Sequence, residues 1–306
     1  MRESVLTVNL AGLQLANPTV LASGILGYST ETLENLVKYG AGAVVTKSIG
    51  LKPRDGYANP TVVQASCGLI NAMGLPNPGI DEYVEELHRT KATLDVPLIL
   101  SVYGYSAEEY ATVAKKATAA GADAVELNVS CPHVKDTGSE IGQSPGVLAE
   151  VVRQVRISIG KPIFVKLSPN VTSVAELAAV AAQAGADGLT IMNTVKAMAI
   201  DVETARPILG NKVGGLSGPA IKPVALRCVY EAYERVKIPI MGCGGIADWR
   251  DAVEFLLAGA SAVQIGTAVS FRGPNVFRSV AIGIGRYLKS KHFGRVEEIV
   301  GLSHRS

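Results

Sequence analysis

The stretch Pro162-Ile-Phe-Val-Lys-Leu-Ser168 opens one apolar run, and Gly185-Ala-Asp-Gly-Leu-Thr-Ile191 opens another 23 residues later. This pairing of a proline run with a Gly-Ala run occurs four times along the chain. The residues that open the four pairs are Pro18 and Gly40, Pro97 and Gly121, Pro162 and Gly185, and Pro239 and Gly259. Each interval, of 22, 24, 23 and 20 residues respectively, is long enough for one short strand, one helix and a turn.

Eight short apolar strands that alternate with helices predict an α/β fold, a closed parallel (β/α)8 barrel of the TIM type. Helix starts support this pattern, because Ser106 and Ser173 each precede a glutamate by three residues and Asp248 can cap a further helix. The glycine of each Gly-Ala pair suits the left-handed position just after a helix. No domain boundary interrupts the pattern, so we expect residues 1–306 to form a single barrel domain.

Composition narrows the class of protein. Hydrophobic residues make up 48% of the chain and charged residues 18%, which indicates a large buried core and excludes global disorder. The net charge of +2 and the lack of long basic runs give no reason to expect nucleic acid binding. No apolar stretch approaches the ~20 residues of a spanning helix, and the first residues lack the layout of a signal peptide. We therefore expect a cytoplasmic protein without membrane association.

Cysteine spacing argues against metal chemistry within the chain. Cys67, Cys131, Cys228 and Cys243 are dispersed, and no Cys-x-x-Cys spacing occurs. This pattern predicts no metal site, no iron–sulfur cluster and no disulfide framework. Cys228 falls in a helical pattern and is expected in the core.

Three connections are much longer than the others. They follow the second, fourth and sixth expected strands, over about residues 48–78, 127–145 and 192–219. Long loops in compact domains are usually functional. All three leave the carboxyl ends of strands, which is the face where a barrel of this type carries its active site.

Polar residues gather at these strand ends, where they become candidates for a site. Lys166 lies inside the apolar strand pattern Phe164-Val-Lys-Leu, and Lys47 follows another strand; a buried lysine is costly unless it is paired. A structural ion pair at the barrel rim is the alternative explanation for both lysines. The other polar candidates at strand ends are Ser23, Ser48, Ser101, Asn128, Asn193 and Thr194.

Glycine loops follow the last two strands. Gly244-Gly245 leads into the helix that Asp248 caps, and Gly266-Thr267 follows the eighth strand. In barrels these two loops and a nearby helix start form the usual phosphate site, because glycine lets backbone amides approach the phosphate closely. The sequence therefore predicts a phosphate-bearing cofactor or substrate.

The segment Asn128-Val-Ser-Cys131-Pro132 is the candidate catalytic segment. A cysteine can act as base or nucleophile when its thiolate is favoured. Cys131 lies in a long loop directly after a strand end, which favours a catalytic role over a role as core filler. Two interpretations of His133 stand on an equal footing: it is a proton relay, or it is a solvated histidine in a loop without a catalytic role.

The chain resembles the dihydroorotate dehydrogenase family over nearly its whole length. The segments that carry this resemblance are Ala22–Gly24, Thr46–Ser48, Asn71–Leu75, Asn77–Gly79, Asn128–Pro132, Lys166–Ser168, Asn193–Thr194, Gly214–Pro219, Gly244–Gly245 and Gly266–Thr267. The resemblance implies an FMN enzyme of pyrimidine synthesis that oxidises dihydroorotate to orotate and transfers hydride to FMN.

The resemblance also implies roles for individual residues. Cys131 would be the catalytic base that takes the C5 proton, and Lys166 would stabilise the negative charge that develops on the flavin. The implied cofactor-binding residues are Ser23, Lys47, Ser48, Ser101, Asn128, Lys166, Ile191, Gly218, Gly244, Gly245, Gly266 and Thr267. The implied substrate-binding residues are Lys47, Asn71, Ala72, Met73, Gly74, Leu75, Asn128, Asn193 and Thr194.

Within the family, a cysteine at the base position is similar to the soluble class 1 enzymes. Met198–Asp201 with Gly214–Pro219 looks like subclass 1B, which implies a homodimer core or heterotetramer with a partner subunit that carries FAD and a [2Fe–2S] cluster and passes electrons to NAD⁺. Ser101, His133 and Lys196 depart from the residues expected at their positions.

Three alternatives stay open on the sequence. The first is a subclass 1A homodimer that reduces fumarate without a partner. The second is a phosphate-binding barrel lyase or aldolase with Lys166 as a Schiff-base nucleophile. The third is a barrel without enzymatic activity. Flavin colour in the purified protein would exclude the last two.

Overall fold

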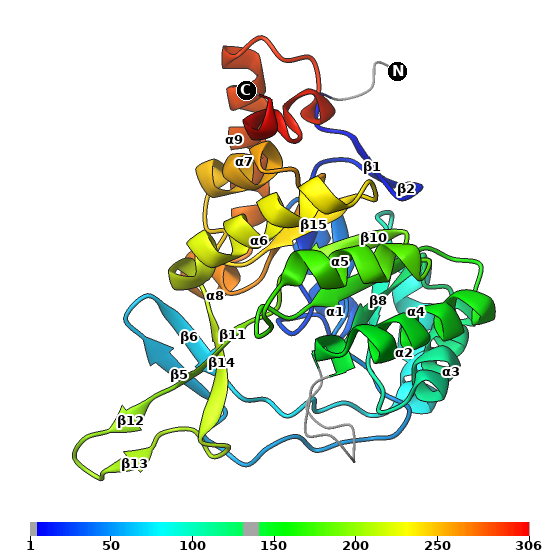
Figure 1. The fold of residues 1–306 in the computed structure, drawn as a ribbon, viewed down its shortest axis with the longest axis vertical. Helices are drawn as coiled ribbons and strands as arrows, with labels where there is room; N and C mark the ends of the chain where they lie inside the picture. The colour runs from blue at the N-terminus through cyan, green and yellow to red at the C-terminus, as the bar shows by residue number, and fades with distance from the viewer. Residues whose placement is uncertain (1–4, 131–140, 306) are drawn as a thin grey trace.

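The computed structural model describes residues 5–130 and 141–305, and its centre is a closed barrel of eight parallel strands (Figure 1). Around the barrel the strands follow the order β10-β15-β16-β3-β4-β7-β8-β9. Their bounds are β3 (Thr19–Leu21), β4 (Ala43–Val45), β7 (Leu98–Val102), β8 (Ala124–Asn128), β9 (Ile163–Leu167), β10 (Gly188–Ile191), β15 (Ile240–Cys243) and β16 (Ala262–Ile265). Each of the eight predicted apolar runs is one of these strands, which confirms the predicted fold.

Helices connect successive strands and pack around the barrel. Their bounds are α1 (Thr30–Lys38), α2 (Ile80–Thr93), α3 (Ala107–Ala119), α4 (Pro145–Ser158), α5 (Val174–Gln183), α6 (Lys222–Arg235), α7 (Trp249–Leu257), α8 (Ala268–Arg272) and α9 (Val276–Ser290). Cys228 is buried on α6, as expected. Among the described residues, no helix is both long enough and apolar enough to cross a bilayer.

The four Gly-Ala pairs end α1, α3, α5 and α7 in the same way. In the first pair the Gly40 N–H donates to the Val37 carbonyl at 2.8 Å, and the Ala41 N–H donates to the Leu36 carbonyl at 3.2 Å. This is the Schellman motif, which requires a left-handed residue at the glycine; the φ of Gly40 is +98°. The other three pairs repeat both bonds. The Gly-Ala repeat therefore marks where each of these helices turns into the next strand.

The predicted helix starts are also present. The side chains of Ser106 and Ser173 accept hydrogen bonds from the N–H groups of Glu109 and Glu176, respectively. Asp248 forms a capping box at the start of α7, with Asp251 as its partner. A short polar side chain at these positions satisfies amides that have no partner inside the helix.

A hairpin of β1 (Val8–Leu10) and β2 (Leu13–Leu15) packs on the amino end of the barrel. Leu10 and Leu15 are fully buried against a layer of barrel residues that includes Val20, Phe164 and Met241. The amino end is thus closed by apolar side chains, so any site inside the barrel must open at the carboxyl end.

Two of the long connections are more regular than their Gly- and Pro-rich sequences suggest. The connection after β4 contains β5 (Val62–Ala65) and β6 (Gly68–Asn71), and the one after β10 contains β11 (Val195–Met198) and β14 (Val213–Ser217). These strands pair in the order β11-β14-β6-β5 to form an antiparallel sheet, here called the outer sheet, which projects from the barrel (Figure 1). A small ribbon of β12 (Ile200–Asp201) and β13 (Arg206–Pro207) lies beyond it. The outer sheet is thus built by both insertions, each of which supplies two of its four strands.

Candidate active site

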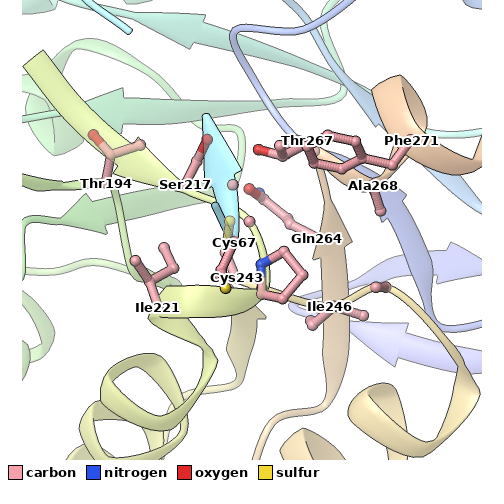
Figure 2. A pocket seen from close by; sticks show the side chains of 18 of the residues that line it. Cys67, Thr194, Ser217, Ile221, Cys243, Ile246, Gln264, Thr267, Ala268 and Phe271 are labelled. Carbon is pink, nitrogen blue, oxygen red and sulfur yellow. The ribbon is translucent and has the colours of Figure 1, made fainter. Parts of the chain in front are cut away.

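A cavity of about 440 Å³ lies at the carboxyl end of the barrel. This volume falls in the range of small-molecule and cofactor sites. Figure 2 shows Cys67, Cys243 and Gln264 around the same space, although they come from the outer sheet hairpin, β15 and β16. The cavity therefore lies between the barrel and the outer sheet, on the face where the sequence predicts the site.

The floor of the cavity carries a buried ionic network. Lys166 on β9 lines the cavity and is only 5% exposed. Its ammonium group donates to Gln264 Oε1 at 3.0 Å and lies 3.6 Å from Glu126 Oε1. Glu126 Oε2 accepts from Thr190 Oγ1 at 2.8 Å and from Gln264 Nε2 at 2.6 Å. Four strands thus share one hydrogen-bonded cluster inside the barrel.

Burial and neighbouring charges have opposing effects on the pKa values of Lys166 and Cys243 in this network. Burial is the largest single effect on the pKa of Lys166 and lowers it, but the charge and hydrogen bonding of the adjacent Glu126 carboxylate, together with a smaller contribution from Cys243, outweigh it and hold the pKa above its usual value. Burial raises the pKa of the Cys243 thiol, and the nearby Lys166 only partly offsets this rise. The cavity floor therefore presents an ammonium cation beside a neutral thiol at neutral pH.

Hydroxyl and amide groups form a second network along the carboxyl ends of β3, β4, β7 and β8. Ser48 is its centre: its hydroxyl lies 2.8 Å from Ser101 Oγ and 3.3 Å from Ser23 Oγ, and it accepts from Asn128 Nδ2 at 3.1 Å. Asn128 Oδ1 in turn accepts a long bond of 3.4 Å from Asn193 Nδ2. Ser101, which departs from the residue expected at its position, is integrated here as a hydrogen-bonding partner of Ser48.

Glycine loops after β15 and β16 form another wall of the cavity, which Gly244, Gly245, Gly266 and Thr267 line. In the described part of the chain, none of the backbone hydrogen bonds outside helices and strands has a donor among these four residues. Loop amides beside a cavity that donate to no protein acceptor are suited to a phosphate or another anion.

Asp251 anchors the first of these loops. Its Oδ2 accepts from the N–H groups of Ala247 and Asp248 at 2.8 and 3.0 Å, and its Oδ1 accepts from Lys222 Nζ at 2.8 Å. Burial raises the pKa of Asp251, but the bonds from Lys222 and the two amides outweigh it and leave the pKa below its usual value. The carboxylate therefore fixes the loop through Ala247, which lines the cavity.

We expect Asp251→Ala to destabilise the protein by about 2 kcal/mol, because it removes charge-assisted bonds to two amides and one lysine. Because the folded-state pKa is lowered, this contribution is present at neutral pH and is lost as the pH falls through that pKa in acid. Thermal unfolding of the two proteins should therefore differ at pH 7 and converge toward acid pH. Glu254→Ala is the matched control, since Glu254 contacts Lys222 but is not a capping partner of α7; an equal loss there would contradict the assignment.

The chain is similar to known proteins over nearly its whole length. A family model described as dihydroorotate dehydrogenase matches residues 5–288. The chain is 54% identical over 299 residues to a dihydroorotate dehydrogenase B (NAD(+)) catalytic subunit of Pyrococcus abyssi, which covers 98% of this chain and 99% of that protein. Proteins with the same name from Pyrococcus furiosus and Methanothermobacter thermautotrophicus are 52% and 49% identical, over 97% and 98% of this chain and over 98% and 99% of those proteins.

The chain belongs to the dihydroorotate dehydrogenase family. This confirms the resemblance inferred from the strand-end segments. The segments that carry the resemblance are spread along the chain, which agrees with the extent of the matches. The relatives named here are all B-type catalytic subunits, as the resemblance to subclass 1B implied.

The residues of the cavity fit the FMN that the family resemblance implies. The cavity has the volume for a cofactor, its glycine loops offer amides for a phosphate, and Lys166 offers a buried cation. Of the predicted cofactor-binding residues, those that line the cavity are Ser23, Lys166, Gly218, Gly244, Gly245, Gly266 and Thr267, and of the predicted substrate-binding residues, Asn193 and Thr194.

Other predicted residues lie around the cavity without lining it. Ser48, Ser101 and Asn128 connect to it through the hydroxyl and amide network. Ile191 is fully buried at the end of β10, and the Lys47 N–H donates to the Gly27 carbonyl at 2.7 Å.

The predicted substrate segment Asn71, Ala72, Met73, Gly74 and Leu75 continues from β6 of the outer sheet. It is held by its backbone, since Ala72 donates to the Thr61 carbonyl and the carbonyls of Met73 and Gly74 accept from Tyr57 N–H and Arg54 Nε. Asn71 Nδ2 donates to the Gly215 carbonyl of β14 at 3.3 Å. The segment lies outside the residues that line the cavity, so its role in substrate binding stays a prediction.

Cys131 and His133 lie outside the described residues, so their predicted roles stay predictions. Sequence reasoning missed Gln264 and Thr190, although each is a polar residue in the middle of a buried strand. It also missed the β5–β6 turn, whose residues Gln64–Gly68 line the cavity. A polar residue inside a strand pattern, the signal that identified Lys166, would have found the first two.

Proposed function

We propose that this chain is the catalytic subunit of a B-type dihydroorotate dehydrogenase, with residues 1–306 forming one FMN-binding barrel domain. It oxidises dihydroorotate to orotate, and electrons pass to NAD⁺ through a partner subunit that carries FAD and a [2Fe–2S] cluster. The observation that carries this proposal is the buried Lys166 cation at the floor of a cavity that is also lined by a pair of glycine loops.

In this proposal the cavity holds FMN, and the bound flavin supplies the hydride acceptor. The amides of Gly244, Gly245, Gly266 and Thr267 bind its phosphate. Lys166 would supply a fixed positive charge to the bound flavin, which would stabilise the negative charge that the flavin gains on reduction. Ser23, Lys47, Ser48, Ser101, Asn128, Ile191 and Gly218 complete the proposed cofactor site.

C5 of the substrate is a methylene group whose hydrogens are acidic because it adjoins a carbonyl, and C6 loses a hydride. Cys131 acts as the base that takes the C5 proton. Lys47, the segment Asn71–Leu75, Asn128, Asn193 and Thr194 bind the carboxylate and the ring amides. Amide side chains suit this ring because each offers both a donor and an acceptor.

Anaerobic addition of dihydroorotate to the purified protein tests the activity. We expect yellow protein whose flavin absorbance is bleached by dihydroorotate, with orotate formed in equal amount. Protein that purifies without flavin, or whose flavin is not bleached, would exclude the proposed function.

The electron acceptor separates the B-type enzyme from a subclass 1A homodimer. Co-expression with an iron–sulfur flavoprotein subunit should give a complex that reduces NAD⁺ with dihydroorotate, whereas turnover with fumarate by the isolated chain would favour subclass 1A. The second alternative, a Schiff-base lyase or aldolase, is disfavoured by the ion pair that keeps Lys166 protonated, since an ammonium group is not a nucleophile.

Gly266→Val tests the phosphate loop. We expect FMN affinity to fall by at least about tenfold, since Gly266 lines the cavity and a side chain there removes space beside the amides. Folding should be retained, because a Cβ on Gly266 would meet only Ala22 Cβ at 3.4 Å and Ile25 Cγ2 at 4.0 Å. Gly245 is a poorer probe, since its Cβ would lie 2.7 Å from Lys222 Cβ.

FMN titration of the apoprotein measures the effect. The matched control is Gly146→Val at an exposed position of α4, where a Cβ would meet nothing within 4 Å. Parental FMN affinity in Gly266→Val would place the phosphate elsewhere.

A further inference from the structure

Glu126 is a fully buried carboxylate that the mechanism above does not use. It lies on β8 and is 0% exposed, and it does not line the cavity. Its hydrogen-bonding partner Gln264 lies on β16, on a distant part of the barrel wall, so the two side chains meet through the barrel interior. An ionised carboxylate in such a place is strongly unfavourable unless a cation compensates it.

The two oxygens of Glu126 have different partners. Oε2 accepts the bonds from Thr190 and Gln264, while Oε1 makes no hydrogen bond to any described residue and lies 3.6 Å from Lys166 Nζ. The amide of Gln264 bridges the pair, since its oxygen accepts from Lys166 and its nitrogen donates to Glu126. The carboxylate is therefore oriented with one oxygen toward the ammonium group.

Among the described residues that face Lys166, Glu126 supplies the negative charge that balances the ammonium group. Cys243 on β15 is the other titratable group nearby, and burial keeps its thiol neutral by raising its pKa. Gln264 on β16 is uncharged. Without Glu126, the Lys166 ammonium would be a buried charge with only polar neighbours, a situation that favours loss of its proton.

We propose that Glu126 is a positioning residue that keeps Lys166 charged and fixed at the cavity floor before any flavin is reduced. This inference rests on the proposed function, because it gives the charged Lys166 a flavin to act on. Glu126 lies behind Lys166 as seen from the cavity and acts only through it.

The number of protons taken up on reduction follows from this role. In the parent protein Lys166 already carries its charge, so reduction of bound flavin by two electrons takes up one proton and gives an anionic reduced flavin beside the ammonium. In Glu126→Gln the lysine is neutral beforehand. Reduction then takes up two protons. The flavin binds the first, and either Lys166 or the flavin ring binds the second.

The pH dependence of the flavin midpoint potential measures this proton count. We expect the slope in Glu126→Gln to be twice that of the parent between pH 6 and 9, two protons per two electrons instead of one. Thr190→Val is the matched control, since it removes one bond to Glu126 Oε2 and leaves every charge in place; it should keep the parental slope. An unchanged slope in Glu126→Gln, an equal change in Thr190→Val, or a parental slope that already corresponds to two protons would each overturn the proposal.

Stability of the apoproteins tests the ion pair without flavin. In Glu126→Gln the folded-state pKa of Lys166 falls below its unfolded value, so the unfolded state binds more protons and stability rises with pH between the two values. In the parent the folded-state pKa is raised, so Lys166 contributes no such rise below pH ~10. The melting temperature of Glu126→Gln should therefore approach that of the parent from pH 6 to pH 10, and a constant difference would contradict the proposal. If the protein binds no FMN, the proposed function fails while this measurement still decides the role of Glu126.

Discussion

The Lys166→Met variant is expected to reduce bound flavin with dihydroorotate about 10²- to 10³-fold more slowly than the parent, the usual effect of removing one group that stabilises developing negative charge. Methionine has a similar length and fills the same buried space. Stopped-flow measurement of flavin absorbance after anaerobic mixing gives the rate, and FMN content before mixing shows whether the cofactor is still bound.

This substitution also leaves Glu126 as an unpaired buried charge, which typically costs about 3–5 kcal/mol of stability. The double variant Lys166→Met/Glu126→Gln separates the two effects, since it contains neither charge. It should recover most of the stability and remain slow. A double variant that reduces its flavin at the parental rate would show that the Lys166 charge has no part in hydride transfer.

The Cys131→Ala variant is expected to lose dihydroorotate oxidation by about 10²- to 10⁴-fold while it retains FMN, because this is the usual contribution of a general base. Cys131→Ser should keep some activity that rises at higher pH, since a hydroxyl is a much weaker acid than a thiol. The measurement is the pH profile of flavin reduction by dihydroorotate from pH 6 to 10 for the parent and both variants.

Another thiol provides the control. Cys67 is exposed and lines the cavity from the β5–β6 turn, so Cys67→Ala removes a cavity thiol without touching the proposed base. We expect Cys67→Ala to behave like the parent. If Cys67→Ala rather than Cys131→Ala abolishes flavin reduction, the base is Cys67; if neither does, His133 becomes the next candidate.

The barrel was predictable because its signals are local. A proline before a strand and a Gly-Ala pair after a helix each reflect the backbone of a few neighbouring residues, and the Schellman bonds at Gly40 and Ala41 show that local cause directly. The site face was predictable for the same reason, since strand ends can be read from the apolar runs. Lys166 was found because a charged residue interrupts such a run.

The outer sheet was not predictable in this way. Its strands are short, and the two halves lie in different insertions, so no local pattern marks their pairing. Gln264 was missed for a related reason: its partners Lys166 and Glu126 come from strands far away in sequence. A polar residue inside an apolar strand predicts a buried polar contact. The partner in that contact becomes known only from the closed barrel, because it comes from another strand.

The outer sheet has a consequence for the order in which the molecule is completed. Asn71 on β6 bonds to the Gly215 carbonyl across 144 residues of sequence. The β5–β6 hairpin alone is at most marginally stable, as isolated hairpins are in water. During synthesis it emerges long before β14, so the wall that it contributes to the cavity lacks its β14 partner until the chain has grown past Ser217. The cavity is thus among the last parts of the molecule to be completed, so a ligand that needs this wall can bind only after the chain has grown past Ser217.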